Sequence, residues 1–155
     1  MSARHGTADV GDDTAVSWAG FVDTFVAFWE APAERLGLFR SIASPDIVLR
    51  APGFRSTRGV DAGIAAFERT LAAMPDLTAR VHGAAASSDG SLFVEMTFGA
   101  TIGRRRVEWR NVDRFVLRGG LAVERIAYFD PTRVRRALVS SPRGWRQLAR
   151  LRFGI

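Results

Sequence analysis

The sequence contains no cysteine and no lysine, and only two histidines, His5 and His82. The lack of cysteine excludes disulfides, thiolate nucleophiles and cysteine metal sites, and it fits a reducing compartment, so we expect a cytoplasmic protein. The lack of lysine excludes a Schiff base and a lysine general base, because an arginine guanidinium keeps its proton in proteins. Two histidines are too few for a multi-histidine metal centre. We therefore expect neither a metal nor an organic cofactor.

Long apolar runs are missing as well, and the first 14 residues are polar, which argues against a membrane span and a secretory signal. The formal net charge of +6 comes from one end of the chain. Residues 131–155 carry seven arginines and no acid, whereas residues 1–130 are nearly neutral. Because a nucleic-acid-binding domain spreads positive charge over a face of its fold, we expect no nucleic-acid partner. Heavy arginine use without lysine is typical of a high-GC bacterial source.

Hydrophobic periodicity divides the body of the chain into helices and then strands. Three segments with helical spacing come first: about 14–31, a stretch beginning near Pro32, and a stretch capped by Asp61. A short strand, 46–52, precedes the third helix. Beyond Pro75 the period changes to two in four segments separated by glycine-containing turns: about 77–86, 91–101, 104–117 and 121–130. This order predicts an α+β domain in which an antiparallel sheet carries the helices on one face.

The pattern predicts a disordered leader (1–13), one domain (14–131) and a basic helical C-terminal tail (132–155). Two short helices are expected in the tail, at about 132–139 and 143–152. Arginines alternate there with leucines and a tryptophan, which leaves two interpretations. Either the tail makes peripheral contact with a membrane surface or an acidic partner, or it packs its apolar edge on a protein surface while the arginines stay in water.

Several local strings support a family resemblance when they are taken in order. They are an aromatic first helix, Ser44-Pro45-Asp46, Arg58-Gly59-Val60-Asp61, Asn111-Val112-Asp113-Arg114-Phe115 and Arg125-Ile126-Ala127-Tyr128-Phe129-Asp130-Pro131. In this arrangement the chain resembles the SnoaL-like proteins and ketosteroid isomerases of the nuclear transport factor 2-like superfamily. The resemblance implies a cone-like half barrel, in which a curved sheet and three N-terminal helices enclose a pocket for a small apolar molecule. It also implies a homodimer through the outer sheet face, where Val112 and Val116 lie.

Side chains of this pocket follow from strand alternation and from the resemblance together. In the longest strand, Trp109 and Asn111 share the predicted inner face with Asp113, because successive strand residues point to opposite faces. In the last strand Arg125 and Phe129 share one face. The resemblance adds positions at which relatives carry functional groups. The expected substrate-binding residues are Phe25, Ala51, Met96, Phe98, Trp109, Asn111, Arg125 and Phe129.

Asp113 is the candidate catalytic residue. Burial favours the neutral form of a carboxyl unless a cation or hydrogen-bond donors compensate. Its segment resembles the ketosteroid isomerase strand that carries a protonated aspartate as an oxyanion donor. Asp113 would then be an acid or a hydrogen-bond donor to the ligand. If Arg125 meets it on the adjacent strand, Asp113 is instead an ionised structural partner, and the sequence leaves both interpretations open.

The remaining isomerase groups are absent. The resemblance puts the general base at Ala51 and the first-helix tyrosine at Phe25, and neither side chain can exchange a proton. The arginine and aspartate of the limonene type of epoxide hydrolase fall on Met96 and Phe98. We therefore expect a SnoaL-like protein that binds a polyketide- or steroid-like molecule. As an enzyme it would be a cyclase or an isomerase that moves a proton next to a carbonyl. The alternative is a non-catalytic dimerisation or partner-docking module.

Overall fold

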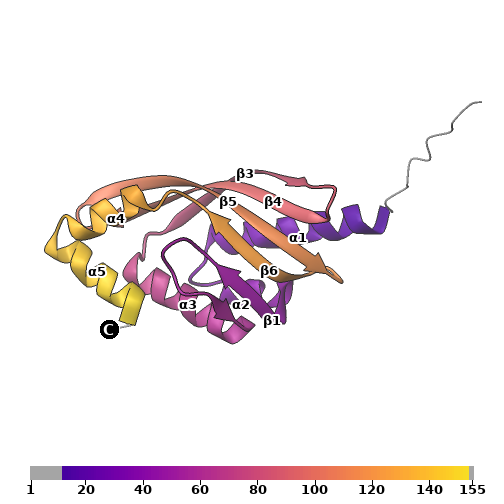
Figure 1. Cartoon of the computed structure of the whole chain (residues 1–155), viewed down its shortest axis with the longest axis horizontal. Helices are drawn as coiled ribbons and strands as arrows, with labels where there is room; N and C mark the ends of the chain where they lie inside the picture. Colours follow the sequence, from indigo (N-terminus) through magenta and orange to yellow (C-terminus); the bar gives the residue numbers. More distant parts are fainter. Residues whose placement is uncertain (1–11, 154–155) are drawn as a thin grey trace, which may run out of the picture.

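The computed structural model describes residues 12–153, and these form one mixed α+β unit (Figure 1). In chain order the elements are α1 (Asp12–Glu30), α2 (Leu36–Ile42), β1 (Ala43–Arg50), β2 (Thr57–Arg58), α3 (Val60–Ala73), β3 (Thr78–Ala86), β4 (Ser91–Ile102), β5 (Arg105–Arg118), β6 (Leu121–Tyr128), α4 (Thr132–Val139) and α5 (Pro142–Phe153). The predicted α+β class is confirmed. The leader predicted for residues 1–13 lies outside the described residues, except for Asp12 and Asp13, which begin α1.

The six-stranded sheet has the order β2-β1-β6-β5-β4-β3. Its strands β3 to β6 form the predicted antiparallel meander. The sheet is nevertheless mixed, because β1 pairs with β6 in parallel. A parallel pair needs a long connection between its strands, and here the connection comprises β2, α3 and the first three strands of the meander. This pairing joins the two halves of the chain.

Helices α1, α2 and α3 lie along one face of the curved sheet, whereas α4 and α5 gather at one end (Figure 1). The aromatic stripe of α1 is buried there, with Phe25 and Phe28 at 0% exposure. The Phe25 ring meets Phe115 of β5 edge to face, with centroids 5.2 Å apart. Burial of large rings is the main stabilising term of such a layer. The helical spacing in α1 therefore places its aromatic side against the sheet.

The start of α3 differs from the prediction. Gly59, not Asp61, is the N-cap, and its φ of +94° lies in the region that favours glycine. Asp61 falls in the first turn and forms an ion pair with Arg40. Further along, a Cβ added at Gly63 would lie 2.7 Å from Cδ1 of Leu49, so glycine allows α3 to approach β1 closely. The helix is thereby held over one end of the sheet.

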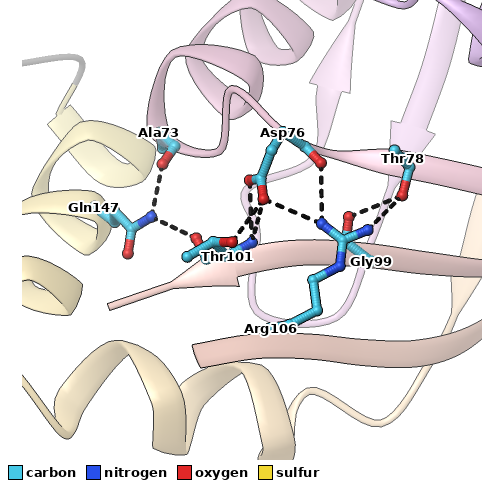
Figure 2. A network of polar contacts seen from close by, with 7 residues as sticks. All are labelled: Ala73, Asp76, Thr78, Gly99, Thr101, Arg106 and Gln147. Carbon is cyan, nitrogen blue, oxygen red and sulfur yellow. Dashed lines mark hydrogen bonds and ion pairs between the residues drawn. The ribbon is translucent and has the colours of Figure 1, made fainter. Parts of the chain in front are cut away.

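The C-terminal helices pack on the domain through their apolar edge. This agrees with the interpretation that the tail packs on a protein surface while its arginines stay in water. Leu138 is buried, and Leu148 and Leu151 contact the core. Gln147 of α5 fixes this position with its side-chain amide (Figure 2). Its Nε2 donates to the Ala73 carbonyl at 3.0 Å and to the Thr101 carbonyl at 2.9 Å, and its Oε1 accepts from the Gly103 amide at 2.7 Å. None of the helices within residues 12–153 is long and apolar enough to cross a membrane.

Asp76, between α3 and β3, belongs to the same network (Figure 2). The backbone N–H of Thr101 donates to both carboxylate oxygens at 3.0 Å, and the Thr101 hydroxyl donates to Oδ2 at 2.7 Å. Arg106 adds an ion pair at 3.1 Å. The hydrogen bonds from Thr101, with a smaller contribution from Arg106, hold the pKa of Asp76 below its ordinary value. The network joins the end of α3, the sheet and α5.

Candidate functional site

The inner face of β5 and β6 carries the polar side chains predicted for the pocket. Trp109, Asn111 and Asp113 alternate with outward residues, and Asn111 and Asp113 are 2% and 0% exposed. Arg125 on β6 is 9% exposed and shares this face. Because β5 and β6 are antiparallel neighbours, these side chains come from adjacent strands and meet inside the molecule.

Three of them form a connected polar group. Oδ2 of Asp113 accepts from Nε of Arg125 at 2.7 Å, and Oδ1 accepts from Nδ2 of Asn111 at 2.9 Å. An ionised carboxylate only accepts hydrogen bonds, so Asp113 dictates the orientation of the Asn111 amide. The Arg125 guanidinium also lies over the Phe67 ring, 5.7 Å from its centroid. Asp113 therefore holds Arg125 and Asn111 in place. The sequence left open whether Asp113 contacts a ligand or pairs with Arg125, and in the structure it pairs with Arg125.

Two buried polar atoms near this group lack a hydrogen-bond partner. They are Oδ1 of Asn111 and Nε1 of Trp29, and they are the only such side-chain atoms found in the described part of the chain. An unpaired buried donor or acceptor costs about 1–3 kcal/mol. Both residues line one pocket. The two residues that carry these atoms are thus part of the pocket wall.

This pocket has a volume of about 910 Å³ and lies between the sheet, α3 and the C-terminal helices. Large apolar side chains make up much of the wall: Trp29, Leu49, Phe67, Met74, Leu77, Phe98, Trp109, Phe129 and Leu151. The rings of Phe98 and Trp109 are stacked, with centroids 5.5 Å apart. A cavity of this size with a few polar groups is typical of small-molecule sites.

Most of the residues expected at the site lie together in this wall. Ala51, Phe98, Trp109, Asn111, Arg125 and Phe129 line the pocket. Phe25, Met96 and Asp113 are absent from the wall, and each is 0% exposed. Phe25 and Met96 belong to the packed core. These two residues therefore belong to the core and not to the pocket for which they were predicted.

Several lining residues were not expected from the sequence. Trp29 follows Phe25 by one helical turn, and Phe67 belongs to the apolar stripe of α3, and neither is among the residues predicted for the pocket. Arg55, Arg69 and Arg152 come from a loop, from α3 and from α5. Helical spacing indicates which face of a helix is apolar. It does not indicate that a loop, α3 and α5 all contribute to the wall of one pocket.

The pocket wall offers no group that exchanges a proton near neutral pH. Its titratable side chains are all arginines, and no carboxylate, histidine or tyrosine lines it within residues 12–153. His82 is exposed on β3, where a ring nitrogen lies 2.7 Å from the Thr97 hydroxyl. The described residues also contain no cluster of three or more metal-ligating side chains. Hydrogen bonding and charge are therefore the chemistry of this wall.

Comparison with known proteins shows the family and the fold of this chain. Residues 20–125 match the family model of the SnoaL-like domain. A proposed SnoaL-like polyketide cyclase from Jannaschia sp. CCS1 superposes with a TM-score of 0.68 at 17% identity, covering 79% of this chain and 93% of that one. An NTF2-like protein of unknown function from Burkholderia pseudomallei gives 0.67 at 20% identity, covering 77% and 97%.

An LEH-like epoxide hydrolase from M. tuberculosis has a TM-score of 0.64 at 20% identity and covers 86% of this chain and 96% of that one. At such identities the likeness concerns the fold alone. No curated protein matches the sequence. The family model spans both halves of the sheet and the helices beneath it, and the chain therefore belongs to the SnoaL-like domain family, with an NTF2-like fold.

Proposed function

We propose that this protein binds a small, mostly apolar molecule that carries oxygen atoms, such as a polycyclic ketone. The observation that carries the proposal is that two residues of one apolar pocket, Asn111 and Trp29, each have a buried polar atom without a hydrogen-bond partner, Oδ1 and Nε1. A hydroxyl group of the ligand would satisfy the acceptor, and a carbonyl oxygen would satisfy the donor. Such contacts gain affinity because they give each of these atoms the hydrogen-bond partner that it lacks within the described residues.

Arg125 is the second polar contact that we assign to the ligand. Its Nε is occupied by Asp113, which leaves its two terminal nitrogens, for which no acceptor is found among residues 12–153. Fixed donors in a low-dielectric pocket polarise a carbonyl more strongly than water does. The ion pair with Asp113 keeps the guanidinium in place, so Arg125 recognises the ligand and Asp113 is a positioning residue.

Binding accounts for the pocket better than proton transfer does. A cyclase or isomerase reaction next to a carbonyl needs an acid or a base within hydrogen-bond reach of the substrate. Both oxygens of Asp113 are engaged by Arg125 and Asn111, and Asp113 is not part of the wall. The proposed polyketide cyclase and the epoxide hydrolase share the fold with this chain. We assign to this chain their kind of pocket without a proton-transferring group.

Titration with a matched pair of tricyclic compounds tests the proposal. We expect 9-fluorenone to quench the fluorescence of Trp29 and Trp109, which both line the pocket. Fluorene has the same rings without the carbonyl oxygen, and we expect it to bind about tenfold more weakly, the equivalent of one hydrogen bond to a charged donor. Equal affinities would remove the carbonyl contact, and no saturable quenching by either compound would overturn the proposal.

A pair of alanine variants locates the binding. Ala51 lines the pocket, so Ala51→Phe puts a ring into the space that the ligand needs. Ala72 is exposed on α3 and lies outside the pocket wall, so Ala72→Phe is the matched control. We expect the first variant to lose 9-fluorenone binding and the second to retain it. The reverse result would place the ligand elsewhere.

A further inference from the structure

We infer that the natural ligand is an organic acid, whose carboxylate is held at the outer end of the pocket by Arg55, Arg69 and Arg152. This inference rests on the proposed function and names the substrate class of the same pocket. Its first support is the charge of the wall. The titratable side chains that line the pocket within residues 12–153 are five arginines, without an acid among them: Arg50, Arg55, Arg69, Arg125 and Arg152.

Two of these arginines have their charge balanced inside the protein. Arg50 forms an ion pair with Glu124 at 2.7 Å, and Arg125 forms one with Asp113 at 2.7 Å. Arg55, Arg69 and Arg152 form no ion pair with any side chain of the described part. Three like charges facing one hollow repel each other, and an anion bound between them relieves this repulsion.

The two ends of the pocket differ in exposure. Asn111 and Arg125 are buried at its inner end, whereas Arg55, Arg69 and Arg152 are exposed. Apolar side chains make up much of the rest of the wall. The matching ligand is therefore amphipathic, with a neutral oxygen at the inner end, an apolar body, and a negative charge near the solvent. Guanidinium groups bind carboxylates well because their planar donors match the two oxygens.

The C-terminal helices supply part of this arrangement. Val134 of α4 and Leu151 of α5 line the pocket together with Arg152, and all three follow the segment that the family model matches. Arg135 of α4 also lies against the loop that carries Arg55. A Cβ added at Gly53 in this loop would be 3.0 Å from Nη2 of Arg135.

Gln147, five residues before Arg152, fixes α5 through three hydrogen bonds. Figure 2 shows the two that its Nε2 donates. The tail thus closes one side of the pocket and adds a positive charge to it. Part of the proposed acid site therefore comes from residues beyond the segment that the family model matches.

The test compares 9-fluorenone-2-carboxylate with its methyl ester and with 9-fluorenone. The native protein should bind the acid about tenfold more tightly than either neutral compound in low salt, the sum of three partly exposed charge contacts. Raising the ionic strength to about 0.5 M should remove most of this preference, because exposed charges are screened. An acid bound no better than the ketone would overturn the inference and leave the proposed function standing. Failure of all three compounds to bind would instead refute the proposed function.

Charge-neutral variants identify the arginines responsible. The triple variant R55Q/R69Q/R152Q should bring the acid-to-ketone affinity ratio close to one. The triple variant R133Q/R136Q/R146Q removes the same charge from exposed positions of α4 and α5 outside the pocket, and it should keep the native ratio. Equal loss of the preference in both variants would show a general effect of net charge and would contradict the assignment. If the first variant does not fold, the salt dependence of the native ratio decides.

Discussion

Asp113 is fully buried, and both of its oxygens accept hydrogen bonds from side chains that line the pocket, Asn111 and Arg125. A buried charge is tolerated when a partner of opposite sign and further donors surround it. In return, the carboxylate sets which atoms of its two neighbours remain for a ligand. The chemistry of the site thus depends on a residue that the ligand need not touch.

Replacing this carboxylate should destabilise the fold. Asp113→Asn leaves the buried guanidinium of Arg125 without its counter-charge, and we expect a loss of about 3–5 kcal/mol in the free energy of unfolding. Urea denaturation followed by circular dichroism measures this loss. The double variant D113L/R125M removes both charges, and it should recover most of the stability while losing the preference for 9-fluorenone over fluorene. A double variant as unstable as the single one would contradict the account of a compensated pair.

Strand parity was sufficient to predict the inner face of β5 from the sequence, including Trp109, Asn111 and Asp113. Parity could not decide whether Asp113 acts on a ligand or pairs with Arg125, because that depends on the register between β5 and β6. It also could not separate pocket from core. Met96 of β4 points inward as parity predicts, but other side chains fill the space around it, and the same holds for Phe25 on the buried face of α1.

Asp76 should make the stability depend on pH. Its folded-state pKa is lowered by hydrogen bonds from Thr101, so the ionised form stabilises the fold at pH values above the ordinary range of an aspartate. This contribution is lost as the pH falls from about 4 through the lowered pKa. Because the Asp76 side chain is 47% exposed and solvent weakens its contacts, we expect Asp76→Asn to be less stable than the native protein at pH 7 by about 0.5 kcal/mol. Urea denaturation between pH 7 and pH 3 should show this difference shrinking below pH 4, and a constant difference would argue against it.

At the scale of elements, α5 shows what a helical pattern can and cannot indicate. Its sequence alternates arginines with Trp145, Leu148 and Leu151, and this pattern was sufficient to place an amphipathic helix at the right residues. Its docking site depends on Gln147 reaching carbonyls of α3 and β4, which are distant in sequence. The three hydrogen bonds of this amide and the pocket wall beside it produce no periodic pattern in the sequence, so they could not be predicted from it.

Removing the Gln147 amide should loosen α5. Gln147→Leu leaves the Ala73 and Thr101 carbonyls and the Gly103 amide without their partner, and we expect a loss of about 1–3 kcal/mol. Hydrogen exchange followed by mass spectrometry should show faster exchange in α5 than in β4 or β5. Arg146→Leu changes the neighbouring exposed position and serves as the control. Unchanged exchange in α5 of the Gln147 variant would show that its apolar edge alone holds the helix.

At the scale of the molecule, the pairing of β1 with β6 could not be predicted from local sequence patterns. The residues of β1 were sufficient to predict a strand. Its parallel partner β6, however, is more than 70 positions further along the chain, as the pair Val48 and Glu124 shows. Sequence order favours antiparallel neighbours joined by short turns, so an antiparallel sheet was predicted and the parallel pair of β1 with β6 was not foreseen. The mixed sheet brings Leu49 of β1 and Arg125 of β6 into one pocket wall.

The outer face of this sheet leads to a prediction for the assembly. Val112 and Tyr128 are directly opposite each other on β5 and β6, and Tyr128 is 51% exposed. Val116 and Ile126 add apolar surface on the same side, so we expect two copies of the chain to pack these faces together in a symmetric dimer. Analytical ultracentrifugation should then give about twice the mass of 17.0 kDa for one chain.

Val112→Arg adds a positive charge between Arg110 and Arg114 on the same face of β5, so two copies would repel each other there and the mass should shift to that of one chain. Val139→Arg is the control, because Val139 is 57% exposed on α4, away from the sheet face. A native protein that keeps the mass of one chain up to about 100 μM would contradict the dimer, since an obligate interface persists at far lower concentrations. The pocket opens toward the opposite side of the sheet from Val112, so ligand binding should be the same in the Val112→Arg monomer as in the dimer.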